Sequence, residues 1–135
     1  MSEVTKEAMK KRTKQFALRV INLASALPDN AVGRVIANQV ISSGTSVGAN
    51  YRAALRARST RDFSNKIGVV LEESDESAYW MELIIEGKIM PENRVASLLQ
   101  EANELTAIFA ATHKTVKTNA RRKNPNPKSE IINPK

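Results

Sequence analysis

The chain has 135 residues, which is enough for one domain with a single core and too few for two. It contains no cysteine, which excludes disulfides and thiolate metal sites and leads us to expect a cytoplasmic protein. Its net charge of +7 and the lack of an apolar run long enough to span a membrane favour a soluble protein with a polyanionic partner.

Apolar residues recur at spacings of three, four and seven residues in four successive segments, which predicts four amphipathic helices. The predicted helices cover residues 5–26, 31–58, 60–87 and 91–118. Pro28-Asp29-Asn30 separates the first two, and Asn30 is a suitable N-cap. Gly87 is expected to stop the third helix, and Pro91 suits the first turn of the fourth.

Short connections between amphipathic helices favour an all-α fold, an up-and-down antiparallel four-helix bundle formed by residues 1–118. The inner faces of the first two helices are expected to carry Met9, Phe16, Val20, Leu23 and Leu27, then Val32, Ile36, Val40, Val47, Tyr51 and Ala54. Residues 119–135 contain three prolines and few apolar side chains, so we expect a basic, flexible tail. Its Arg121-Arg122-Lys123 cluster is either a solvated chain end or a phosphate-seeking arm.

Positive charge is concentrated in the second predicted helix. Residues 31–61 contain five arginines and no carboxylate, whereas residues 62–90 contain seven carboxylates and two lysines. At about 100° per residue, Arg34, Arg52 and Arg56 lie on one face of the helix, away from its apolar stripe. This ridge is either a solvated face, partly paired with acidic residues, or a track for an RNA or DNA backbone.

The third predicted helix has a second apolar stripe beside its main one, formed by Val69, Trp80, Leu83 and Ile84. Contact with two neighbouring helices explains such a wide apolar face, but Trp is also favoured at subunit interfaces. Val69, Trp80 and Ile84 are therefore candidate residues of a homo-oligomer interface.

Small and polar residues interrupt the second helix. Gly44 and Gly48 lie four residues apart, a spacing that permits close approach of another helix. Polar groups between the second and third helices must find partners when they are buried. We expect a hydrogen-bonded link of Asn50 with Glu73, or of Arg52 with Glu76, that sets the register of the two helices.

A longer motif resembles a known family. The run SSGTSVGANYRAALRARSTRDFSNKIGVVLEESDESAYWMELI, residues 42–84, resembles the proteins named after the intervening sequences of bacterial 23S ribosomal RNA genes. The likeness extends more loosely over residues 16–118. It implies a left-handed antiparallel bundle that forms a homopentameric ring. The family is similar in architecture to the accessory proteins of diversity-generating retroelements, which bind nucleic acid and a reverse transcriptase.

The resemblance brings no catalytic residue and no cofactor, so we expect a non-enzymatic, oligomeric protein that binds RNA or another nucleic acid through its basic surface. A protein–protein scaffold without nucleic-acid binding is the alternative.

One acidic pattern suggests a different activity. Glu72-Glu73-x-x-Glu76 and Glu101-x-x-Glu104 resemble a degraded form of the Mg²⁺-binding motif of all-α nucleotide pyrophosphohydrolases. This more distant alternative predicts Mg²⁺-dependent release of pyrophosphate, whereas a binding protein shows no turnover.

Overall fold

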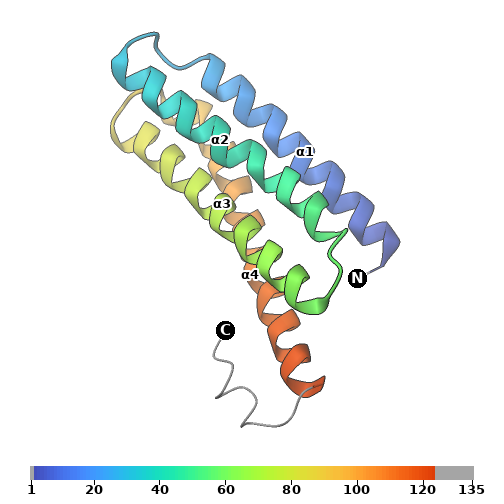
Figure 1. Cartoon of the computed structure of the whole chain (residues 1–135). Helices are drawn as coiled ribbons and strands as arrows, with labels where there is room; N and C mark the ends of the chain where they lie inside the picture. Colours follow the sequence, from blue (N-terminus) through green and yellow to red (C-terminus); the bar gives the residue numbers. More distant parts are fainter. Residues whose placement is uncertain (1, 124–135) are drawn as a thin grey trace.

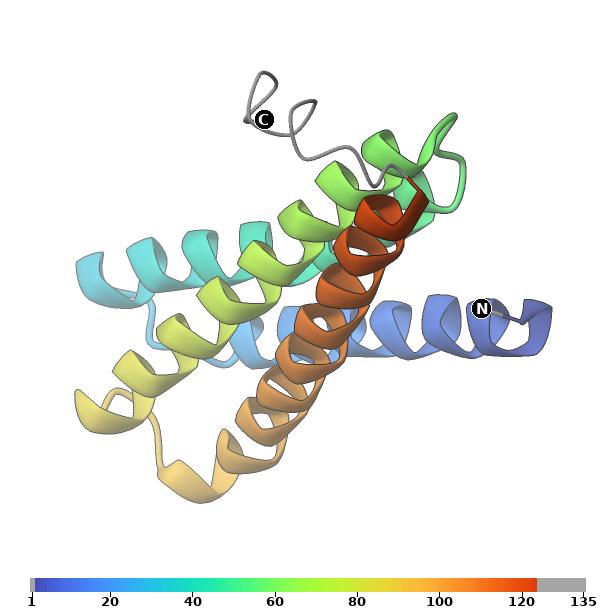
Figure 2. The same cartoon turned by 90° about the horizontal axis from the view of Figure 1, so that it is seen from below.

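The computed structural model describes residues 2–123, and this part of the chain contains four α-helices, one short 3₁₀ helix and no strand. The elements are α1 (Glu3–Ser25), α2 (Ala31–Ala54), α3 (Thr60–Glu86), η1 (Glu92–Arg94) and α4 (Ala96–Lys123). Consecutive helices run antiparallel and form a helical bundle (Figure 1). Seen from below, α1 and α2 form one pair and α3 and α4 a second pair inclined to it (Figure 2).

Short polar side chains fix the starts of three helices. Ser2 Oγ accepts a hydrogen bond from the Thr5 amide at 3.1 Å, and Asn30 Oδ1 accepts one from the Gly33 amide at 2.8 Å. Ser59 Oγ caps α3 by accepting from the Asp62 amide at 3.0 Å. Each bond satisfies an amide that has no partner within its helix, so these residues define where the helices begin.

The helix ends differ from the predicted ones by more than two residues at three places. α2 ends at Ala54 rather than at residue 58, and α4 begins at Ala96, after the 3₁₀ turn, rather than at Pro91. At its other end α4 continues to Lys123, so residues 119–123 are helical and the predicted tail boundary at 119 is wrong. The remainder of that predicted tail, residues 124–135, lies outside the described residues.

The end of α3 is a Schellman turn in which a lysine takes the left-handed position. Gly87 is the C-cap with φ −78°, whereas Lys88 has φ 54°. The Ile89 amide donates to the Ile84 carbonyl and the Lys88 amide to the Ile85 carbonyl, both at 3.0 Å. The left-handed conformation is thus held by two backbone hydrogen bonds, although glycine is the residue that adopts it without steric cost.

The apolar stripes of the four helices meet in one core. Its largest fully buried side chains include Phe16, Tyr51 and Phe109, and the Tyr51 and Phe109 rings lie 5.5 Å apart, which joins α2 to α4. Burial raises the pKa of the Tyr51 hydroxyl. The predicted inner residues of α1 and α2 are confirmed except for Met9, which is half-buried, and Val32, which is 57% exposed near the start of α2.

Glycines bring α1 and α2 into close contact. A Cβ atom at Gly44 would lie 2.7 Å from Val20 Cγ1, and one at Gly48 would lie 3.2 Å from Thr13 Oγ1. Val20 and Thr13 are both fully buried, so neither can move aside into solvent. The predicted close approach at Gly44 and Gly48 is confirmed, and α1 is the helix that approaches.

Arg12 joins the first helix to the last. Its Nε and Nη2 atoms donate to the two carboxylate oxygens of Glu101, each at 2.8 Å, and Nη2 also donates to Glu104 at 2.9 Å. These hydrogen bonds, with the Glu101 carboxylate foremost, raise the pKa of the Arg12 guanidinium. The bidentate geometry closes the side of the bundle between α1 and α4.

No helix of the described residues is long and apolar enough to cross a membrane.

Replacing Arg12 with glutamine removes the bidentate pair and leaves Glu101, whose side chain is only 18% exposed, with a poorer partner. We expect a loss of unfolding free energy on the order of 1–2 kcal/mol, measured by urea denaturation. Lys11→Gln, at the exposed neighbouring position, is the matched control and should change little. Equal stability of Arg12→Gln and the unmodified protein would show that the hydrogen bonds of Arg12 with Glu101 and Glu104 do not stabilise the fold.

Replacing Lys88 with glycine removes the steric cost of the left-handed conformation. We expect the variant to be about 1 kcal/mol more stable in chemical denaturation. Lys88→Ala, which removes the charge but keeps Cβ, should bring little of this gain. A gain of the same size in the alanine variant would assign the effect to the charge instead of the backbone.

Candidate functional site

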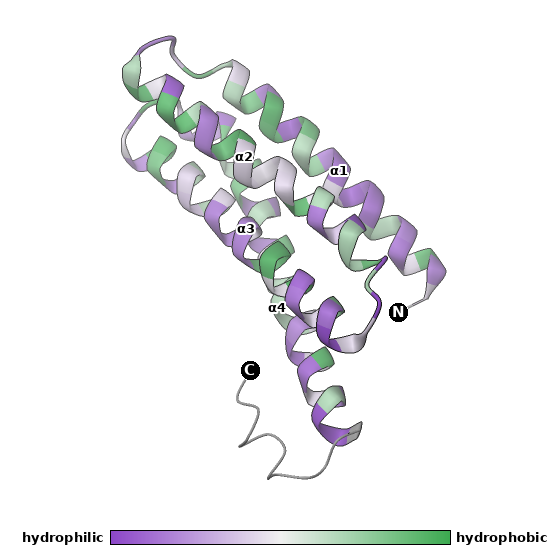
Figure 3. Ribbon diagram, in the orientation of Figure 1, coloured by the Kyte–Doolittle hydropathy of each residue, from purple (hydrophilic) through white to green (hydrophobic). Residues whose placement is uncertain are grey.

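The antiparallel order gathers most of the positive charge at one end of the bundle. Residues 2–14, 50–66 and 111–123 contain 15 lysines and arginines and three carboxylates. The other described residues, 15–49 and 67–110, contain four lysines and arginines and ten carboxylates. We call the first set the basic end. In Figure 3 the N-terminal half of α1 is coloured mostly as hydrophilic.

Two neighbouring hollows show that the three segments of the basic end meet. One is lined by Arg58 of the α2–α3 connection and the other by Lys6 of α1, and both contain Phe63, Val116 and Asn119. The connection after α2 and the N-terminal part of α1 therefore both lie against the last turns of α4. Cationic side chains from all three segments surround this end.

Four of the predicted nucleic-acid-binding residues lie in this region. Arg52 is in the last turn of α2, Arg56 lies in the turn that follows, and Arg121 and Arg122 are in the last turn of α4. All four side chains are exposed. Lys123 is the last residue of α4. The arginines of α2 and of the α4 end are thus brought to the same end of the molecule.

Arg34 does not belong to this group. It lies in the first turns of α2, about 27 Å along the helix from Arg52 at 1.5 Å per residue. Its Nη1 atom donates to Asp29 at 2.9 Å. Because α2 ends at Ala54, Arg56 is also off the helix. Arg34 and Arg52 are both exposed on α2, as predicted, but Arg56 does not continue their ridge.

The three carboxylates of the basic end each pair with a lysine. Lys6 contacts Glu3 at 3.2 Å, Lys10 contacts Glu7 at 3.1 Å, and Lys66 contacts Asp62 at 2.7 Å. The hydrogen bond from Lys66, aided by the Arg58 amide, lowers the pKa of Asp62. These pairs account for the three carboxylates of the basic end, and Arg12 is paired with Glu101 and Glu104 of α4. A positive excess remains among the other cations.

Several basic residues of this region were not recognised as part of the site from the sequence. They are Lys6, Lys10, Lys11, Lys14, Arg58, Arg61, Lys66, Lys114 and Lys117. The net charge of each helix taken separately does not reveal this cluster, because each helix contributes only the basic residues near one of its ends. Adding charge along the axis of an antiparallel bundle would have found the cluster.

The predicted polar link between α2 and α3 uses other residues. Asn50 Nδ2 donates to the Ser46 carbonyl on its own helix at 2.8 Å, and Glu76 accepts from Trp80 Nε1 at 3.2 Å. A buried bond from Ser77 Oγ to Ser43 Oγ, 3.1 Å long, joins the two helices instead. The predicted Asn50–Glu73 and Arg52–Glu76 hydrogen bonds are thus wrong. The side-chain hydrogen bond between α2 and α3 is formed by Ser43 and Ser77 instead.

The candidate oligomer interface is only partly at the surface. Val69 is 38% exposed and Trp80 is half-buried, but Ile84 is fully buried in the core and is not available to a partner. The Tyr79 ring, 52% exposed, packs against the Trp80 ring at 5.2 Å. Val69, Tyr79, Trp80 and the half-buried Leu83 form what we call the outer α3 stripe.

The acidic pattern of the alternative enzyme is divided between two environments. Glu101 and Glu104 are bound by Arg12, whereas Glu73 lies on α3, where burial and then the charges of Glu76 and Glu72 raise its pKa. Within residues 2–123, no group of three or more His, Asp or Glu side chains has a geometry that could hold a metal ion. The two halves of the motif therefore do not form one cation site.

Comparisons with known proteins agree with this architecture. A crystal structure of a protein of unknown function from the S23 ribosomal protein family of Bacteroides thetaiotaomicron is similar, with a TM-score of 0.74 and 32% sequence identity. The match covers 81% of this chain and 97% of that one. A search of curated proteins gives no match. The family model described as 23S rRNA-intervening sequence protein matches residues 5–111, so the chain belongs to that family.

Proposed function

We propose that the protein is a non-enzymatic nucleic-acid-binding module that holds RNA at its basic end. The observation that carries this proposal is the excess of 15 lysines and arginines over three carboxylates in the segments that meet there. Such a cluster gains affinity by releasing counterions from a phosphate backbone and needs no base-specific pocket. The family's link to 23S rRNA intervening sequences favours RNA over other polyanions.

The arrangement of the basic end suits an extended strand more than a compact ligand. Its cations come from α1, from the α2–α3 connection and from α4, and α4 projects beyond the other helices (Figure 1). Exposed arginines on separate segments can contact successive phosphates along a backbone. Arg52 and Arg56 form one such group, and Arg121 and Arg122 form another.

We expect charge reversal at either group to weaken RNA binding. Arg52→Glu with Arg56→Glu, or Arg121→Glu with Arg122→Glu, should each lower the affinity for a fluorescein-labelled single-stranded RNA at least about tenfold, and should flatten its salt dependence. Fluorescence anisotropy over a series of salt concentrations measures both effects. Circular dichroism checks that the variants remain helical.

The matched control is Arg34→Glu, an exposed arginine of the same helix at the opposite end. It should change RNA affinity less than about twofold. Unchanged affinity in both double variants, or an equal loss in Arg34→Glu, would remove the basic end as the binding surface. No binding by the intact protein at low salt would favour the protein scaffold instead.

We also propose that copies of this chain associate through the outer α3 stripe, in the homopentamer that the family resemblance implies. The exposed Tyr79 ring and the half-buried Trp80 ring share the outer face of α3 with Val69 and Leu83, and such aromatic residues anchor subunit interfaces. The stripe lies on the outside of α3, so a second copy can reach it without opening the bundle. A ring would repeat the basic end in every subunit and multiply its contacts with one RNA.

Sedimentation equilibrium tests the assembly. The unmodified protein should have five times the 14.9 kDa mass of one chain, and Val69→Lys should shift it to smaller species because a charge would be buried at the interface. Lysine at 69 can pair with Glu73 one turn later, so the helix itself should persist. Leu18→Lys, at a 51% exposed position of α1, is the control. An unchanged mass for Val69→Lys would move the interface elsewhere.

A further inference from the structure

The inner face of α4 loses its cover at the basic end. Its core stripe continues at alternating spacings of three and four residues, from the buried Leu105 and Phe109 to the half-buried Thr112 and Val116 and then to the exposed Asn119. The N-terminal part of α1 and the C-terminal part of α4 diverge in both views (Figures 1 and 2). The last turns of the stripe are therefore open to a ligand.

Two adjoining hollows lie over this part of α4. Their volumes are about 540 Å³ and about 410 Å³, within the range of small-molecule sites. Phe63, Val116 and Asn119 line both hollows. Phe63, near the start of α3, is half-buried and packs against the hydrophobic core. The core thus holds an aromatic ring in place at the wall that the two hollows share.

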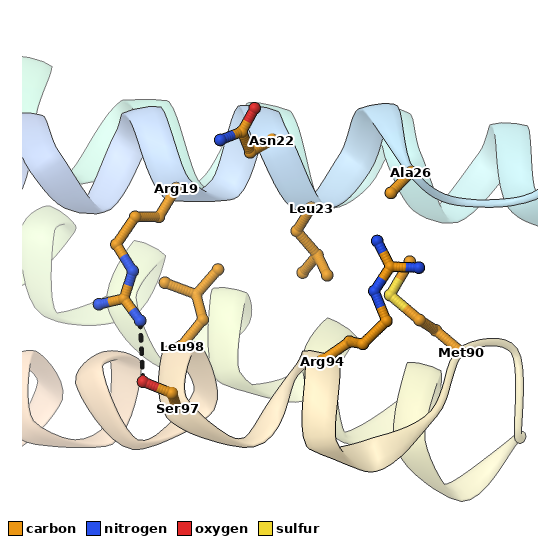
Figure 4. Close-up of a pocket in the computed structure, with 8 residues that line it drawn as sticks. All are labelled: Arg19, Asn22, Leu23, Ala26, Met90, Arg94, Ser97 and Leu98. Atoms are coloured by element: carbon orange, nitrogen blue, oxygen red, sulfur yellow. Dashed lines mark hydrogen bonds between the residues drawn. The ribbon is translucent and has the colours of Figure 1, made fainter.

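The hollow at the other end of the seam between α1 and α4 has a different lining. In Figure 4 Arg19 and Arg94 lie at its opposite ends, and Leu23 and Leu98 lie between them. Arg19 Nη2 donates to Ser97 Oγ at 3.0 Å, which bridges the two helices there. No aromatic side chain lines that hollow. Of the two ends of the seam, only the basic end combines an aromatic ring with an excess of cations.

The polar groups around Phe63 are those that recognise a nucleobase. Neither hollow has a carboxylate in its lining. The Asn119 carboxamide makes no hydrogen bond to another described residue, so its donor and acceptor groups are available to the edge of a base. Lys6 pairs with Glu3 at 3.2 Å, so phosphate contacts fall to Arg58 and to the other exposed cations of the basic end.

We propose that the larger hollow takes an unpaired base of an RNA strand, which packs against Phe63 and is hydrogen-bonded at its edge by Asn119. The adjacent phosphates contact the cations of the basic end. This base contact rests on the proposed RNA binding there and adds that the RNA is single-stranded. In a duplex the faces of the bases are stacked on one another and their edges are paired, so no base can enter the hollow.

Charge alone predicts the opposite preference. Duplex RNA has a higher charge density than a single strand, so a surface that acts only by counterion release binds the duplex at least as tightly. Contacts between a base and an aromatic side chain are strong enough to reverse this order. A preference for the single strand therefore reports on the hollow, whereas the salt dependence reports on the cations.

Fluorescence anisotropy with a labelled single-stranded RNA, and with the duplex that it forms with its complement, tests the base contact. The unmodified protein should bind the strand at least about fivefold more tightly than the duplex. Phe63→Leu keeps an apolar side chain but removes the ring. It should weaken binding of the strand at least about fivefold and binding of the duplex less than about twofold.

Asn119→Ala provides a second variant, at an exposed position where the fold should tolerate it. Binding of the strand should weaken about threefold or more, because the base edge loses a hydrogen-bonding partner. Asn103→Ala is the matched control, since Asn103 is exposed on the same helix outside both hollows. It should leave the affinity within about twofold.

A photo-cross-link locates the base directly in the unmodified protein. A strand that carries 5-iodouridine links on irradiation to an aromatic side chain in contact with that base. Trypsin cuts after Arg61 and Lys66, and Phe63 is the only aromatic residue in the resulting peptide 62–66. Mass spectrometry should find the cross-link in this peptide, and cross-links confined to other peptides would contradict the assignment.

Equal affinity of the unmodified protein for strand and duplex would overturn the base contact, as would an equal loss for both RNAs in Phe63→Leu. A smaller mass of Phe63→Leu in sedimentation equilibrium, with its helix content unchanged, would assign the hollow to a subunit contact instead. The proposed function fails in a different way: the unmodified protein would then bind neither RNA at low salt. Strand and duplex that bind equally tightly, and are both weakened by Arg52→Glu with Arg56→Glu, would remove only the base contact.

Discussion

Short connections between long helices constrain everything else in this molecule. Five residues join α1 to α2 and five join α2 to α3, so each helix must return along its predecessor. The start of α1, the α2–α3 connection and the end of α4 are thereby forced to one end of the bundle. Charges that are scattered along the sequence become segregated in space, and the surface chemistry follows from the topology.

Some of the charges at the basic end agree with the helix dipoles. Glu3 and Asp62 lie in first turns, whereas Arg52, Arg121 and Arg122 lie in last turns. These five side chains are placed where the backbone dipole favours them, whereas Arg61, in the first turn of α3, is not. The remaining repulsion is between exposed groups and is screened by salt. The positive potential can therefore persist at modest cost to stability.

The sequence predicted the fold well because the buried stripes have a clear helical period. It predicted helix ends less well, since α4 continues to Lys123 after its apolar stripe has ended. Ala, Arg and Lys favour helix without packing, and the first proline after them is Pro125. Ile84 was misassigned for a related reason: α3 contacts both α2 and α4, and periodicity alone does not separate the edge of a buried face from an exposed stripe. The Ser43–Ser77 hydrogen bond could not be predicted from the sequence. It depends on the register between α2 and α3, which the periodicity of a single helix does not determine.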